Sequence, residues 1–235
     1  MRIKTIFLSL LVLSVAVYYI NLEYQKRKTL SMYADYIKGY TSKKEKLEQL
    51  HNNHNFKIIM IGDSITAGNN WNKSFNRNDI LNMGQGADVT DITIIDKKFG
   101  IINRLDGLDN LYKKAFLMIG INDILSKSKT TKKIFDNYIK IISIVQDNNI
   151  TPIIQSTLYI TNKKYKFNLS KINTQVQELN NLLKNYSYLN KIKFIDLNNA
   201  LSTNQQLKDA YTYDGIHLNK KGYKVWSKAI MPYIY

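Results

Sequence analysis

One serine and one histidine in the sequence could work together as a nucleophile and its base. Ser64 follows Gly62 and Asp63 at the end of an apolar run that is typical of a buried strand, and the chain has only three histidines. His51 and His54 precede the regular pattern of strands and helices, which leaves His217. A serine hydroxyl is a weak nucleophile until a base removes its proton, and imidazole is suited to that task at neutral pH. Asp214 stands close enough in sequence to accept the imidazole Nδ1–H and fix its tautomer.

Other polar groups could stabilise the negative charge of an acyl-transfer intermediate, which requires hydrogen-bond donors already in place. We expect these donors to be the backbone N–H of Ser64, one backbone N–H of the glycine-containing loop over 82–88, and the side-chain amide of Asn122. Each feature has a plain structural alternative, because serines after strands often cap helices and glycines shape turns. Their joint occurrence in order along the chain predicts serine-based acyl transfer.

An alternation of strands and helices positions these residues. Apolar runs predict strands over 56–61, 79–83, 115–119, 151–156 and 193–197. Helical periodicity predicts helices over 90–105, 132–146, 170–189 and 222–234. Five strands that alternate with helices predict an α/β fold with a parallel sheet covered on both faces. Ligands of such folds bind beyond the carboxyl ends of the strands, where the candidate side chains follow.

Three carboxylates stand beside the candidate residues without an expected role in proton transfer. Asp63, Asp88 and Asp123 each follow one of the predicted strands, close to the start of the next helix. Carboxylates accept backbone N–H groups at helix starts and are stabilised there by the helix dipole. We therefore expect these three to be structural.

The N-terminus has the pattern of an export signal. Residues 5–22 carry no charge, follow Arg2 and Lys4, and precede the basic run 26–28. As a helix this stretch would cover about 27 Å, close to the thickness of a bilayer core. We expect residues 1–28 to form an uncleaved, single-pass signal anchor that holds an exported domain at the cell membrane. A cleaved signal is the alternative.

Residues 29–55 have helical spacing and many charges, and we expect a helical stalk before a catalytic domain over 56–235. The stalk is either a spacer or a first helix packed on the domain. The oligomeric state is left open.

Composition narrows the possible partners. The net charge is +16, from 34 Lys and Arg against 18 Asp and Glu. The lysines are scattered, and neither a nucleic-acid motif nor a basic stripe interleaved with aromatic residues is present, so we expect a solvated basic surface and no nucleic-acid partner. The absence of cysteine excludes disulfides, a thiolate nucleophile and cysteine-bound metals. We expect no metal and no cofactor.

The four stretches that hold the candidate residues resemble the signature blocks of the SGNH (GDSL-type) hydrolases. Residues 61–66, Ile-Gly-Asp-Ser-Ile-Thr, are similar to the nucleophile block, and 82–88 are similar to the second block. Residues 118–123 contain Gly-x-Asn-Asp, and 213–219 contain Asp-x-x-His. Four blocks in the family's order make the resemblance specific.

This resemblance implies a three-layer flavodoxin-like fold and assigns a role to each candidate. It implies that Ser64 is the nucleophile, His217 its base, Asp214 the partner of the base, and Asn122 an oxyanion donor. The second backbone donor falls on Ala87, where the family has glycine, or on the adjacent Gly86.

The blocks look most like the branch with platelet-activating-factor acetylhydrolase subunits and bacterial carbohydrate O-acetylesterases. With export, this implies an esterase for O-acetyl groups on an envelope or surface glycan, or for a small ester. Three alternatives stay open: a lysophospholipase or thioesterase, a glycan O-acetyltransferase, and a non-catalytic glycan-binding module.

Overall fold

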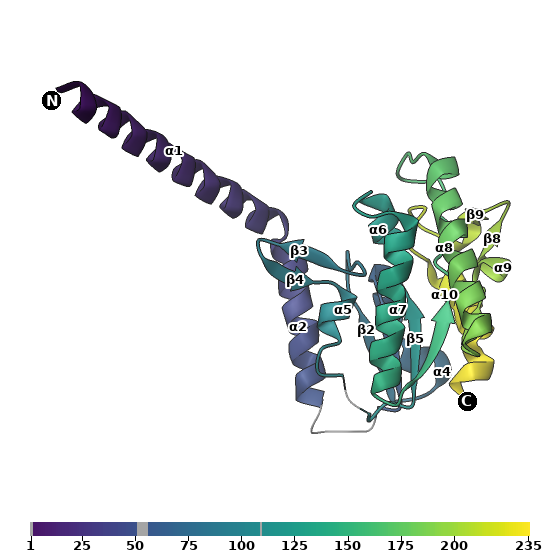
Figure 1. Cartoon of the computed structure of the whole chain (residues 1–235). Coiled ribbons are helices and arrows are strands. Elements are labelled where there is room, and N and C mark those ends of the chain that lie inside the picture. The colour runs from purple at the N-terminus through teal and green to yellow at the C-terminus, as the bar shows by residue number, and fades with distance from the viewer. Residues whose placement is uncertain (1, 51–55, 109) are drawn as a thin grey trace.

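A five-stranded parallel sheet forms the centre of the structure, which is a computed structural model (Figure 1). It describes residues 2–50, 56–108 and 110–235, and the side chains of all these except 2–11 and 46–50. The strand order is β2-β1-β5-β6-β7. The strands are β1 (Ile58–Gly62), β2 (Ile80–Gly84), β5 (Lys114–Met118), β6 (Thr151–Gln155) and β7 (Lys193–Ile195). Every pairing in this sheet is parallel, which confirms the predicted α/β fold.

Helices cover both faces of this sheet because each has one apolar side to bury. α5, α7 and α8 pack beside one another over one face, and α4 and α10 pack together over the other (Figure 1). The rings of Trp71 in α4 and Trp226 in α10 lie 4.8 Å apart and are almost fully buried. The helices of the domain are α3 (Ser64–Ala67), α4 (Trp71–Phe75), α5 (Ile101–Arg104), α6 (Ile121–Leu125), α7 (Thr131–Asp147), α8 (Leu169–Leu189), α9 (Asn198–Leu201), the 3₁₀ turn η1 (Asp209–Tyr211) and α10 (Lys220–Ile234).

The prediction of a helix over 90–105 is wrong. This stretch forms a hairpin of β3 (Ile92–Ile94) and β4 (Lys97–Phe99), followed by the short helix α5. The two residues between the strands, Ile95 and Asp96, both have positive φ, which is the geometry of a tight hairpin turn. The apolar residues of this stretch fit the periodicity of a helix as well as that of a strand, and the β-branched side chains among them favour the strand. A second small hairpin, which the sequence analysis did not predict, pairs β8 (Ser202–Thr203) with β9 (Gln206–Leu207).

Two long helices precede the domain. α1 (Arg2–Met32) extends away from it, and α2 (Ala34–Leu50) turns back along the β3–β4 hairpin (Figure 1). Tyr36 and Tyr40 of α2 pack against Phe99, with ring centroids 6.2 and 4.9 Å from it. In the region predicted as a stalk, α2 is therefore packed on the domain, and residues 51–55 lie outside the described residues.

The membrane-spanning helix predicted over residues 5–22 has no support. In the part of the chain that the structure describes, no helix has the length and the apolar run needed to cross a bilayer.

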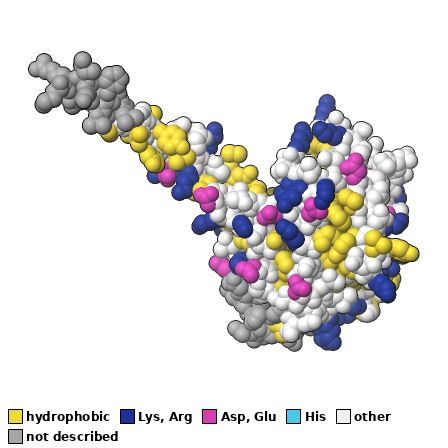
Figure 2. Space-filling model, viewed as in Figure 1, with side chains coloured by type: hydrophobic (Ala, Val, Ile, Leu, Met, Phe, Trp, Pro, Cys, Tyr) yellow, Lys and Arg dark blue, Asp and Glu magenta, His cyan; other side chains and the backbone are white. Residues whose placement is uncertain are grey.

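The basic residues are dispersed over the surface. Figure 2 shows Lys and Arg side chains spread across the visible face of the domain, with Asp and Glu among them. This distribution agrees with the scattered lysines of the sequence.

Because β2 lies close to α3, adding a methyl group at Gly84 should lower the stability of the protein. A Cβ on Gly84 would collide with the backbone of Ala67, whereas a Cβ on Gly86 would meet nothing within 4 Å. We expect Gly84→Ala to lower the free energy of unfolding by about 2 kcal/mol, because backbone cannot yield as a side chain can. Gly86→Ala should change it by less than about 0.5 kcal/mol. Urea denaturation of both variants checks this, and equal losses would contradict it.

Candidate active site

Three side chains from opposite ends of the domain sequence meet at the carboxyl edge of the sheet. The Oγ of Ser64 lies 2.9 Å from Nε2 of His217. The Nδ1 of His217 lies 2.7 Å from Oδ2 of Asp214. The structure thus joins the predicted nucleophile, base and orienting carboxylate in one chain of hydrogen bonds.

The serine is presented by the turn from β1 into α3. Asp63 is the N-cap of α3, and its carboxylate accepts the backbone N–H of Ile65 at 2.9 Å. Ser64 is therefore the first residue of the helix, where its N–H has no partner within the helix. Ser64 is only partly buried, whereas its neighbours Asp63 and Ile65 are buried.

The loop before α10 fixes the orientation of the base. Asp214 Oδ1 accepts the backbone N–H groups of Ile216 and His217, which leaves Oδ2 for the imidazole. Burial raises the pKa of Asp214, but the hydrogen bonds from the His217 ring and from the two backbone groups outweigh it and hold this pKa below its ordinary value. The carboxylate is thus ionised at neutral pH and accepts Nδ1–H, so that Nε2 faces Ser64 as an acceptor.

The predicted oxyanion donors surround the same edge. Asn122 lies in the first turn of α6, and its amide donates one hydrogen to the Asp88 carbonyl at 2.8 Å, so a second hydrogen remains. Within the described part of the chain, the backbone N–H groups of Ser64, Gly86 and Ala87 make no hydrogen bond. Gly86 and Ala87 are exposed. Both stay candidates for the second backbone donor.

Ala87 adopts a conformation that suits the glycine found there in the family. Its φ is +58°, in the left-handed region. For a residue with a Cβ this conformation costs about 1–2 kcal/mol. The surrounding contacts, and not local preference, must therefore hold the loop in this shape.

The three carboxylates that we expected to be structural are all buried, and each has a different partner. Asp88 forms an ion pair with Arg104, whose side chain is also fully buried. Asp123 lies 2.9 Å from Lys129 and also accepts hydrogen bonds from Thr90. Arg104 was not predicted from the sequence, where the available signal was an arginine that lies close to Ile101, Ile102 and Leu105.

Asp63 differs because the Oδ2 atom of its carboxyl has no hydrogen-bond partner among the described residues. Burial, aided by the nearby Asp88 and Asp123, raises the pKa of Asp63 to about 7.

Comparison with known proteins identifies the family to which this chain belongs. The GDSL-like lipase/acylhydrolase family model matches residues 60–225, which include all four predicted blocks. The chain belongs to the GDSL-like lipase/acylhydrolase family. The predicted family is confirmed.

The GDSL-type chain is also similar to part of a longer curated protein. It is 28% identical over 178 residues to the N-acylneuraminate cytidylyltransferases of Streptococcus agalactiae, and the match covers 76% of this chain. The chain spans only 38% of the length of these relatives.

Solved structures with the same fold come from several bacteria. A Streptococcus pneumonia protein named as a proposed platelet activating factor is 25% identical with a TM-score of 0.69, over 89% of this chain and 99% of that one. A GDSL-like lipase from Bacteroides thetaiotaomicron is 19% identical with a TM-score of 0.69, over 83% and 96%. A carbohydrate acetylesterase from Sinorhizobium meliloti is 16% identical with a TM-score of 0.59, over 76% and 98%. The last two likenesses show the fold alone.

The raised pKa of Asp63 predicts how stability depends on pH. Between the ordinary value of 3.8 and about 7, the folded protein holds a proton that the unfolded chain has released, so stability falls as pH rises across this window. The side-chain amide in the variant Asp63→Asn cannot titrate, and its oxygen can still accept the Ile65 N–H. We expect the stability of the wild type relative to Asp63→Asn to decrease from about pH 4 to about pH 7 and then level off. Urea denaturation across this range checks it, and parallel curves for the two proteins would contradict it.

Proposed function

We propose that this hydrolase cleaves acetyl esters through an acyl-Ser64 intermediate, and that its substrates are O-acetyl groups on a surface or envelope glycan. The observation that carries the proposal is the pair of contacts of 2.9 and 2.7 Å that link Ser64, His217 and Asp214. A neutral imidazole between an ionised carboxylate and a serine hydroxyl is arranged to take the hydroxyl proton.

The proposed reaction has two steps. In the first, Nε2 of His217 takes the Ser64 proton while Oγ bonds to the ester carbonyl carbon. The carbonyl oxygen becomes an oxyanion, which the Ser64 N–H, a loop N–H and the Asn122 amide stabilise. The tetrahedral intermediate then collapses, the C–O bond to the sugar breaks, and the sugar oxygen leaves with the proton from Nε2. In the second step Nε2 of His217 takes a proton from a water whose oxygen bonds to the acyl carbon. The bond from that carbon to Oγ then breaks, Oγ takes the proton back from Nε2, and acetic acid leaves, which ionises to acetate.

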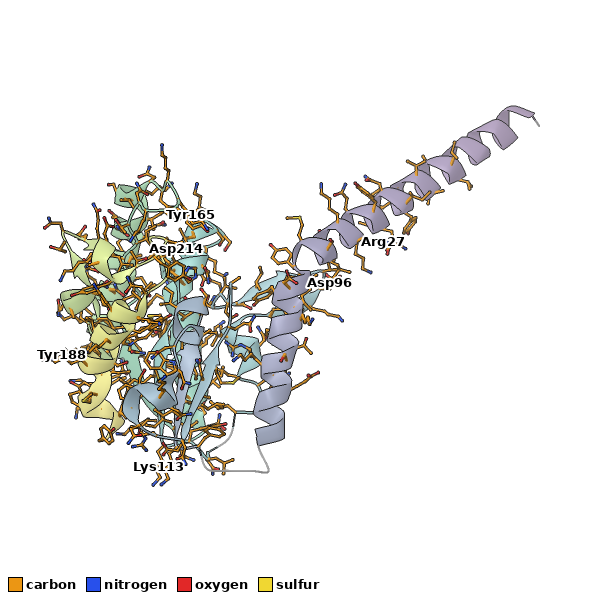
Figure 3. The ribbon with its side chains drawn as sticks, turned by 180° about the vertical axis from the view of Figure 1, so that it is seen from behind. Arg27, Asp96, Lys113, Tyr165, Tyr188 and Asp214 are labelled. Carbon is orange, nitrogen blue, oxygen red and sulfur yellow. The ribbon has the colours of Figure 1, made fainter. Side chains whose placement is uncertain are left out.

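The rim of the site favours a sugar as the alcohol part of the ester. The ring of Tyr213 stacks on the His217 ring with centroids 5.7 Å apart, and its side chain is 62% exposed. Tyr165 is 44% exposed, and Figure 3 shows it at the same end of the domain as Asp214. Exposed aromatic faces beside a reacting group are suited to sugar rings, because they offer flat apolar contact area.

A positive charge at this rim favours an acidic sugar. The backbone N–H of Lys164 donates to the Asp214 carbonyl at 3.0 Å, so Lys164 is fixed next to the triad loop. Its Nζ lies 5.6 Å from the centroid of the Tyr165 ring. A lysine in this position attracts an anionic substrate. The name of the Streptococcus agalactiae relatives, N-acylneuraminate cytidylyltransferase, also points to a sugar acid. The extracytoplasmic location stays a prediction of the sequence.

Esterase assays test the serine mechanism. We expect the full chain to hydrolyse p-nitrophenyl acetate faster than a long-chain ester, and Ser64→Ala and His217→Ala each to lower kcat/KM by at least about 10³-fold. Ser143→Ala, which changes an exposed serine of α7, is the matched control and should keep full activity. Faster turnover of long-chain esters would favour a lipid hydrolase. Absence of both hydrolysis and fluorophosphonate labelling at Ser64 would contradict a serine esterase and favour a binding module.

A comparison of acidic with neutral sugars tests the substrate class. Lys164→Gln should raise KM about fivefold for an O-acetylated acidic sugar, because one exposed charge contact is worth about 1 kcal/mol at most. It should leave KM for an O-acetylated neutral sugar and for p-nitrophenyl acetate unchanged. Lys140→Gln, on the exposed side of α7, should change none of these values. The same KM for acidic and neutral sugars in the wild type would contradict an acidic substrate.

A further inference from the structure

Helix α2 lies outside the stretch that the family model matches, residues 60–225, yet it contacts β2 and the loop that follows it. The Tyr36 hydroxyl donates to Oδ1 of Asp88 at 3.0 Å. Gly39 lies against the side chain of Gln85, with no room for a Cβ between them. The Lys43 ammonium donates to the Asn82 carbonyl at 3.1 Å. Spacings of three and four residues place all three contacts on one face of α2.

Asp88 joins this helix to the oxyanion donors. Its Oδ1 accepts the Tyr36 hydroxyl, and its Oδ2 accepts the Arg104 guanidinium. Its backbone carbonyl accepts the Asn122 amide at 2.8 Å, and its N–H donates to the Gln85 carbonyl at 3.2 Å. A shift of Asp88 would therefore move both the side-chain donor Asn122 and the end of the loop that carries the backbone donors.

The loop between Gln85 and Asp88 depends on such support. Gly86 and Ala87 are exposed and make no hydrogen bond through their N–H groups within the described residues. Ala87 is also held in the left-handed region at φ +58°. Donors to an oxyanion contribute most when they are already in place before the reaction. The contacts at Gln85 and Asp88 are thus what can hold these donors still.

We propose that α2 is a brace for the oxyanion loop, and that Tyr36 is a positioning residue that holds Asp88 and, through it, Asn122 and the loop amides. This inference rests on the proposed serine mechanism. Helix α2, which precedes the residues matched by the family model, would then help to set the geometry of the oxyanion donors.

The chain contains a matched pair of residues for the test. Tyr36 and Tyr40 lie one turn apart on α2, and both rings pack on Phe99. The Tyr36 hydroxyl contacts Asp88, whereas the Tyr40 hydroxyl makes no hydrogen bond to the described part of the chain. Tyr36→Phe and Tyr40→Phe are therefore the same chemical change with and without the contact to the loop.

We expect Tyr36→Phe to lower kcat for p-nitrophenyl acetate about tenfold with KM within about twofold of the wild type, as for loss of a hydrogen bond that supports the transition state. Tyr40→Phe should stay within about twofold in both constants. Both variants should melt within a few degrees of the wild type. Hydrogen exchange of the peptide that covers residues 84–89 should become faster in Tyr36→Phe and not in Tyr40→Phe.

Equal kcat values for the two variants, with Ser64-dependent turnover intact in the wild type, would overturn the brace and leave the esterase standing. A fall in kcat that matches a large loss of melting temperature would also overturn it, because the helix would then act through global stability. If the wild type shows no turnover that depends on Ser64, the serine mechanism fails and the catalytic role of Tyr36 with it. In that case, faster exchange in Tyr36→Phe and not in Tyr40→Phe would still show that the Tyr36 hydroxyl holds the loop in place.

Discussion

The geometry of the site depends on the buried ion pair between Asp88 and Arg104. Both side chains are fully buried, and Arg104 also donates to the Met83 carbonyl at the end of β2. Removal of one partner from such a pair leaves an uncompensated charge and costs about 3–5 kcal/mol. The pair therefore ties the end of β2, the end of α5 and the loop with Gly86 and Ala87 into one unit. Tyr36 and Asn122 attach to this unit through the remaining acceptors of Asp88.

The ion pair also solves an electrostatic problem of the site. Asp63, Asp88 and Asp123 are all buried at the edge where the proposed mechanism develops a negative charge on the substrate. Three unpaired carboxylates there would oppose that charge. Arg104 and Lys129 offset the charges of Asp88 and Asp123. Burial raises the pKa of Asp63 to about 7, so this carboxyl is protonated below that pH. Asp214 faces the imidazole instead, where its negative charge would stabilise the protonated ring in the proposed mechanism.

The sequence predicted well whatever depends on short apolar runs and local motifs. The strands over 58–62 and 114–118 are buried on both faces and stood out as apolar runs that end at the motif residues. The hairpin over 92–99 was missed because its apolar residues fit the periodicity of a helix as well as that of a strand, although their β-branched side chains favour the strand. The contact between Tyr36 and Asp88 joins residues 52 positions apart and leaves no local pattern. The site residues could be named from their blocks, but the helix that supports them could not.

The contact between Ser64 and His217 joins residues 153 positions apart, which has a consequence for the protein during its synthesis. The ribosome synthesises α2, β1, β2 and Arg104 before the segment that holds His217, so the parts that hold the oxyanion loop become available early. The proposed base, His217, comes much later, with the segment just before α10. N-terminal parts fold first as a chain emerges, and long-range contacts form late. By the proposed mechanism, a nascent chain would thus remain catalytically silent until His217 has been synthesised and has reached Ser64.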